Sequence, residues 1–130
     1  MKAADLQIGD LICLKDDTKY ELPLKVDGII EDDISVEGDG FLGGIEGLIR
    51  PIQLTPEILE KNGFTKVNSQ RYDYGYPDTD CYVKVNPKKN MIHVNGRNAN
   101  SNLYSHSFVH ELQRALRLCG LDEIADNFKV

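Results

Sequence analysis

The 130-residue chain has no tryptophan, three histidines, three cysteines and no long apolar run. An odd number of cysteines without a Cys-x-x-Cys pair argues against a disulfide framework and favours a reducing compartment. No segment approaches the roughly 18 apolar residues of a membrane-crossing helix, and the first residues lack the apolar core of a signal peptide. We therefore expect a cytoplasmic protein with no membrane partner.

Positive charge is also scarce, because the net charge is −6. Residues 1–64 hold six Lys and Arg against fourteen Asp and Glu, whereas residues 65–130 hold nine against seven. No basic stripe is present, so non-specific binding to duplex nucleic acid is not expected. The acidic half suggests a different relation to nucleic acid, in which the protein is an acidic mimic of DNA. Such a mimic requires surface rows of carboxylates. The candidates are Asp27, Glu31, Asp32, Asp33, Glu37 and Asp39.

Complete cofactor and catalytic motifs are missing. Gly38–Gly43 has the spacing G-x-G-x-x-G, but a dinucleotide site requires a helix that starts at this loop. Gly47 and Pro51 leave no room for such a helix. The acidic residues between Asp73 and Asp80 lack the glycine and terminal glutamate of a calcium loop. We expect no cofactor and assign no catalytic residue.

Two histidines, His106 and His110, stand four residues apart, a spacing that can place two metal ligands on one helix face. The helix is expected to begin after His106, and Arg114 replaces the second histidine of an H-E-x-x-H motif. No third ligand is evident. A small metal-dependent enzyme that uses His106 and His110 is therefore an alternative. The simpler interpretation is a polar contact at a helix start.

The best-specified local structure is the central stretch, Pro51–Phe64. Thr55 is a typical helix N-cap, and Pro56 suits the first helical position. Gly63 can adopt the left-handed conformation that ends a helix. We predict a two-turn helix whose flanking apolar side chains meet on one side: Leu54, Leu59 and Phe64.

Before this helix, short apolar runs alternate with polar turns. The predicted strands are Leu11–Leu14, Leu24–Ile30, Ile34–Glu37 and Ile45–Ile52, and Gly28 interrupts the second strand in the manner of a β-bulge. Four or five short strands in this space are typical of a small β-sheet or an SH3-like barrel. We assign residues 1–50 to this β-rich part.

After the helix, Tyr82–Asn86 and Met91–Asn95 form predicted strands with one apolar and one mixed face, followed by a polar loop to Asn102. From Ser107 to Cys119, apolar residues recur at helical spacing, with Ser105 or Ser107 as the cap. We predict an α+β protein in which residues 51–130 form one compact unit. This unit consists of the central helix and an antiparallel sheet covered by a C-terminal helix.

Tyrosines alternate in Arg71–Tyr82, a segment that we expect to be a loop or a hairpin edge. Alternate residues of an extended segment project from one face, and tyrosine rings are frequent anchors at interfaces. The candidate binding residues are therefore Tyr72, Tyr74 and Tyr76. The alternative is that one or two of these rings pack against the sheet.

Three motifs together resemble a known family. They are Asp-Leu-Gln-Ile-Gly-Asp at 5–10, the capped stretch at 51–64, and Phe-Val-His-Glu-Leu-Gln at 108–113. Their order and spacing resemble those of a family of short uncharacterised proteins of Bacteroides-type bacteria, often encoded in phage-like or mobile regions. The resemblance covers nearly the whole chain and implies a bacterial, cytoplasmic setting. The family offers no activity or catalytic residue to transfer.

The leading functional hypothesis is a non-enzymatic interaction or accessory module of mobile-element origin with an unidentified protein partner. It rests on the SH3-like strand pattern, the tyrosine-rich segment and the lack of a complete catalytic motif. The metal-dependent enzyme and the DNA mimic are the alternatives, and assembly into a homo-oligomer stays open.

Overall fold

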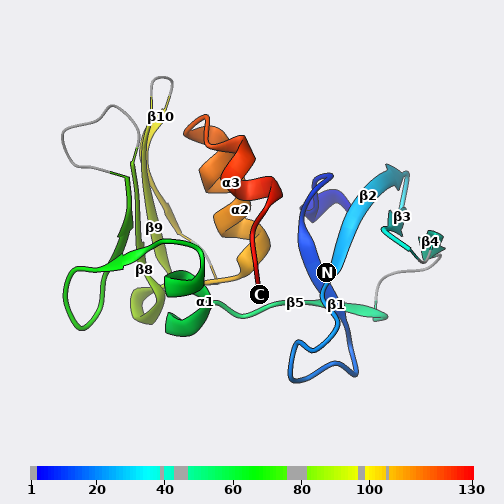
Figure 1. The fold of residues 1–130 in the computed structure, drawn as a ribbon. Helices are drawn as coiled ribbons and strands as arrows, with labels where there is room; N and C mark the ends of the chain where they lie inside the picture. The colour runs from blue at the N-terminus through cyan, green and yellow to red at the C-terminus, as the bar shows by residue number, and fades with distance from the viewer. Residues whose placement is uncertain (1–2, 39, 43–46, 76–81, 97–98, 105) are drawn as a thin grey trace. The chain divides into compact units, whose positions relative to one another are not determined.

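A computed structural model describes residues 3–38, 40–42, 47–75, 82–96, 99–104 and 106–130 (Figure 1). The chain divides into two compact units, Met1–Ile52 and Gln53–Val130. Each unit contains a five-stranded antiparallel sheet, and the second adds three short or medium helices, so the α+β class is confirmed. Within the described ranges, no helix combines the length and apolar character needed to cross a bilayer.

The first unit is a small antiparallel sheet with the strand order β4-β3-β2-β1-β5. Because the described pairings leave β4 and β5 at opposite edges, they do not show closure into an SH3-like barrel. The β4 strand lies within the segment that was predicted to be a glycine-rich loop. The elements are the 3-10 helix η1 (Ala3–Asp5), β1 (Leu11–Leu14), β2 (Leu24–Ile30), β3 (Asp33–Val36), β4 (Gly40–Leu42) and β5 (Ile49–Pro51).

The predicted bulge at Gly28 is confirmed. Pairing between β2 and β3 passes from Val26 opposite Val36 to Gly28 opposite Ser35, which leaves one extra residue on β2. A Cβ atom on Gly28 would lie 2.6 Å from Ser35 Oγ, so glycine permits this close approach. The strands enclose a cluster of buried apolar residues: Ala3, Leu6, Ile12, Val26, Ile34, Val36 and Ile49.

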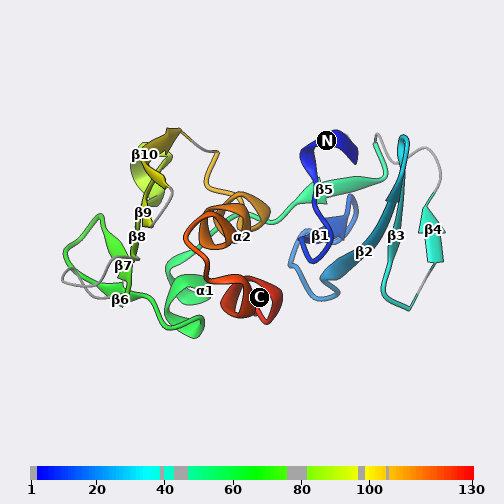
Figure 2. The same cartoon turned by 90° about the horizontal axis from the view of Figure 1, so that it is seen from above.

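The second unit is a meander with the strand order β10-β9-β8-β7-β6. Figures 1 and 2 show α2 along one face of this sheet, where it packs against β9. The strand β10 begins within the predicted polar loop. The elements are α1 (Pro56–Lys61), β6 (Thr65–Lys66), β7 (Tyr72–Tyr74), β8 (Tyr82–Asn86), the 3-10 helix η2 (Pro87–Lys89), β9 (Met91–Gly96), β10 (Ala99–Tyr104), α2 (Val109–Leu118) and α3 (Asp122–Asp126).

The central helix α1 has the predicted caps at both ends. The Thr55 hydroxyl accepts a 3.2 Å hydrogen bond from the Ile58 amide. Gly63 has φ +85°, and the next amide, that of Phe64, donates to the Leu59 carbonyl at 3.0 Å. This pattern is a Schellman motif, which satisfies the last carbonyls of the helix. The flanking apolar side chains are all buried: Leu54, Leu59 and Phe64.

The start of α2 differs from the prediction, because Ser107 does not cap it. The Glu111 carboxylate reaches back and accepts a 2.9 Å hydrogen bond from the His106 amide. Ser107 has φ +61°, and its hydroxyl donates to Asn90 Oδ1 at 2.9 Å, in the turn before β9. This hydrogen bond connects the segment before α2 to the turn that precedes β9. The other predicted cap, Ser105, lies outside the described residues.

Candidate functional site

The strands β8 and β9 carry two faces of different character. Val83, Val85, Ile92 and Val94 are at most 1% exposed and belong to the core between the sheet and α2. The residues between them are half-buried, and strand alternation places them on the opposite face. We call this face the outer face. It carries Tyr82, Lys84 and Asn86 on β8 and Met91, His93 and Asn95 on β9.

Titratable residues from three adjacent strands form one row across the outer face. The backbone register places Asp73 of β7 opposite Lys84 of β8, and Lys84 opposite His93 of β9. Directly opposed residues have Cβ atoms about 4.5–5.5 Å apart, so neighbouring members of the row interact. Arg71 precedes β7, and its Nε lies 3.2 Å from Asp73 Oδ1. The ion pair holds the guanidinium beside the row.

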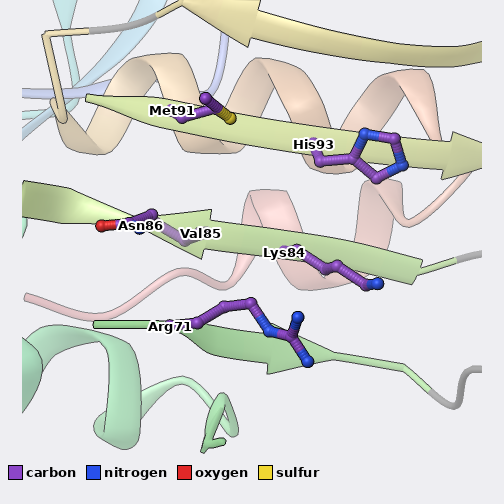
Figure 3. Close-up of a pocket in the computed structure, with 6 residues that line it drawn as sticks. All are labelled: Arg71, Lys84, Val85, Asn86, Met91 and His93. Carbon is purple, nitrogen blue, oxygen red and sulfur yellow. The ribbon is translucent and has the colours of Figure 1, made fainter. Parts of the chain in front are cut away.

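This row borders a pocket of about 270 Å³. Figure 3 shows the side chains of Lys84 on β8, His93 on β9 and Arg71, just before β7, extending toward the same side. The volume is slightly below the roughly 300–1,000 Å³ of typical small-molecule sites, so the pocket suits one charged group better than a whole cofactor. The lining residues are Arg71, Lys84, Val85, Asn86, Met91 and His93.

Tyr82 positions two of the basic side chains. The Lys84 ammonium lies 5.1 Å from the centre of the Tyr82 ring, within the range of a cation–π contact. The His93 ring lies 6.1 Å from the same ring, with an angle of 34° between the planes. The aromatic ring thus restricts the flexible lysine and supports the imidazole, which lowers the entropy lost when an anion binds.

Two of the three tyrosines proposed from the sequence, Tyr72 and Tyr74, lie on the other face. Tyr72 is 5% exposed and pairs with Val85, whereas Tyr74 pairs with Val83. Tyr74 is half-buried, and its ring centre is 5.3 Å from that of Phe64. Tyr72 and Tyr74 therefore share a face, but they pack against the unit's core instead of forming an exposed surface. Tyr76 lies outside the described residues.

The two histidines proposed as metal ligands have different environments. The His106 side chain is 81% exposed, with Nδ1 3.7 Å from a Glu111 carboxylate oxygen, whereas His110 is buried. Both imidazoles stack on the Phe108 ring, at centroid distances of 5.6 and 5.8 Å. Across the described ranges, no group of three His, Cys, Asp or Glu side chains could hold a metal ion. The arrangement is a three-ring stack at the helix entry.

Four of the six carboxylates of the DNA-mimic alternative lie on the hairpin of β2 and β3, and Glu37 follows β3. Asp27 lies on β2, where its carboxylate accepts a hydrogen bond from the Ser35 hydroxyl, and Asp33 begins β3. Glu31 and Asp32 form the turn between these strands. The last candidate, Asp39, is outside the described residues.

Sequence reasoning identified the mixed face of β8 and β9 but not the pocket. Alternation alone separates Lys84 and His93 from the buried valines. Arg71 could not be added to them, because its segment was expected to be a loop or hairpin edge. The missing information was the pairing of β7 with β8.

A scan against models of protein families, a search of the curated proteins and a search of the solved structures each find no match to this chain. The resemblance to proteins of Bacteroides-type bacteria therefore stays a prediction.

Proposed function

We propose that the protein is a non-enzymatic interaction module that binds an acidic segment of a partner protein on the outer face of its second unit. The observation that carries this proposal is the convergence of Arg71, Lys84 and His93 on one pocket. Lys84 and His93 lie on the neighbouring strands β8 and β9, and Arg71 directly precedes β7, on the face opposite α2. A sheet covered by a helix on one side leaves its other side available for a ligand.

The ligand group that fits best is a carboxylate. Arginine and lysine donate charge-assisted hydrogen bonds to carboxylates, and each such bond contributes roughly 1.5–3 kcal/mol when sheltered. Partial solvent exposure reduces this value, since exposed ion pairs contribute only about 0–1 kcal/mol. One carboxylate held by two of these side chains therefore gives a weak contact, and a segment with several acidic residues gives a stronger one.

Two features favour an acidic protein segment over a nucleic acid. The basic groups form a cluster and not a stripe. Met91 adds apolar surface to the pocket, which suits the hydrocarbon part of a glutamate side chain.

The cellular setting belongs to the same proposal. The odd number of cysteines and the lack of a Cys-x-x-Cys pair support a reducing compartment such as the cytoplasm. A mobile-element origin is supported by the resemblance of the three sequence motifs.

The proposal is tested by fluorescence anisotropy with a labelled hexaglutamate peptide, beside a hexaglutamine peptide of the same length. We expect saturable binding of the acidic peptide that weakens as salt screens the charges. Lys84→Ala should weaken it about 3- to 10-fold, the equivalent of roughly 0.7–1.4 kcal/mol. Lys129→Ala removes the same charge from an exposed position in the same unit and should have no effect.

Two results would contradict the proposal. The first is equal affinity of the wild type, Lys84→Ala and Lys129→Ala for the acidic peptide. The second is preferential binding of a single-stranded oligonucleotide through the same pocket, which would assign the outer face to nucleic acid.

A further inference from the structure

The edge strand β10 is the longest open edge in the described part of the protein. It has six residues, whereas the edge strands β4 and β5 have three each and β6 has two. Its sequence, Ala-Asn-Ser-Asn-Leu-Tyr, contains no charged residue and no proline. Charge, proline and short length are the usual features that protect an edge from pairing with another strand. The strand β10 has none of these three protective features.

The hydrogen-bonding direction of β10 follows from its hairpin with β9. Gly96 pairs with Ala99, and only two residues separate them, so this pair exchanges its own backbone hydrogen bonds. Every second residue of β10 then bonds to β9. The backbone N–H and C=O groups of the alternate residues point away from the sheet. Those residues are Asn100, Asn102 and Tyr104.

We propose that two copies of the chain pair antiparallel through β10, about a two-fold axis at Asn102. In this register Asn102 faces Asn102 of the second copy, and Asn100 faces Tyr104 of the second copy. All the outward backbone groups are then satisfied, by about six hydrogen bonds across the three facing pairs. The two sheets become one continuous sheet of ten strands.

A second copy is the occupant that fits this edge best. The outward groups are spaced symmetrically about Asn102, so the strand is complementary to itself, as an isologous interface requires. No facing pair brings like charges together, because β10 has no charge. A different protein would need some feature of β10 to select it, and an uncharged edge offers little selectivity.

The basic pockets do not oppose this pairing. His93 lies one strand in from β10, so the two copies of His93 would be about 14 Å apart, at roughly 4.8 Å per strand spacing. The two copies of Lys84 would be about 24 Å apart by the same spacing. Both separations exceed the Debye length of about 8 Å at physiological salt. The dimer presents two pockets on one extended face, which would favour a ligand with two acidic groups.

The test is the molar mass in solution, measured by light scattering and sedimentation equilibrium from micromolar to submillimolar concentration. The wild type should approach twice the 14.6 kDa of one chain as concentration rises. Asn102→Pro removes an outward N–H and should stay monomeric, since the pairing of β10 with β9 does not use that group. Asn102→Ala keeps the N–H and should dimerise like the wild type.

Two further measurements keep the test decisive if the proline variant unfolds. Asn102→Asp retains the backbone and places two carboxylates face to face, so its dimer dissociation constant should rise at least about tenfold at neutral pH. In the wild type, hydrogen exchange of the Asn100, Asn102 and Tyr104 amides should slow with concentration, whereas the Ser101 and Leu103 amides should not change. A monomeric wild type would overturn the proposal, as would dimerisation of Asn102→Asp equal to that of the wild type.

Discussion

The two units build five-stranded antiparallel sheets in different ways. In the first unit, the strands and the short segment around η1 supply the buried cluster, which includes Ala3, Leu6 and Ile12. In the second unit, α2 covers one face of the sheet and contributes Leu112 and Leu116, which are fully buried. Because α2 covers only one face of the sheet, the side chains of the other face do not belong to the core. That face is where the basic pocket lies.

The two halves of the chain also differ in net charge. Most of the carboxylates lie in the first half of the chain, whereas the second half has a small excess of Lys and Arg. The acidic half keeps the protein soluble and repels other acidic molecules. Our proposal therefore assigns the binding of a negatively charged ligand to the outer face of the second unit and not to the first unit.

The largest effect is expected when the helix that distinguishes the second unit is loosened. Leu112→Ala removes a fully buried side chain of α2 and should destabilise the second unit by about 2–5 kcal/mol. Chemical denaturation followed by amide resonances in both units measures this change. Leu118→Ala, at a position of the same helix that is 49% exposed, should change stability by less than about 0.5 kcal/mol. An equal shift of both units with Leu112→Ala would show that they unfold as one.

A smaller effect is expected at the cap of the central helix. Thr55→Ala removes the acceptor of the Ile58 amide and should lower the stability of the second unit by about 1 kcal/mol. Thr55→Ser retains the acceptor and serves as the control. Thermal unfolding of the three proteins compares them directly. Equal midpoints for wild type and Thr55→Ala would show that water replaces the cap without cost.

The smallest effect is expected in a turn of the first unit, and it depends on pH. The Leu22 and Glu21 amides donate 2.9 Å hydrogen bonds to the Asp17 carboxylate and hold its pKa below 3.8. Because the pKa is lower in the folded state, the stabilisation is present above the unfolded value and is lost as the pH falls through the folded value. Asp17→Asn should therefore be less stable than wild type at neutral pH, and this difference should shrink in acid.

Urea unfolding at neutral and acidic pH checks this prediction for the turn. Asp16→Asn, at the adjacent exposed position, is the matched control and should show no such dependence. A difference between Asp17→Asn and wild type that persists unchanged in acid would contradict the assigned cause.

The elements predicted best from the sequence are those specified by local signals. The limits of α1 follow from Thr55, Pro56 and Gly63, which act within one or two turns of the helix. The bulge at Gly28 is local in the same sense. The first part of strand β10 was predicted to be a polar loop, because Asn100 and Asn102 have low strand propensity. Its pairing with β9 overrides that preference.

The candidate site was predicted less well, because its residues meet only through strand pairing. Lys84 and His93 were correctly assigned to a mixed face, but Arg71 joins them through the register of β7. The alternation predicted that Tyr72 and Tyr74 share a face but not which face, and the structure places both on the face that packs against the core, as in the alternative interpretation. Tyr72 and Asp73 alternate, and burial in the core selects the tyrosine for the covered face.

The central claim is that the outer face of the second sheet binds acidic segments. Its most direct test is the NMR titration of labelled protein with hexaglutamate peptide. Our account predicts shifts concentrated at the side chains of Arg71, Lys84 and His93, with none in the first unit. Shifts confined to the first unit, or spread evenly over the charged residues of both units, would contradict it.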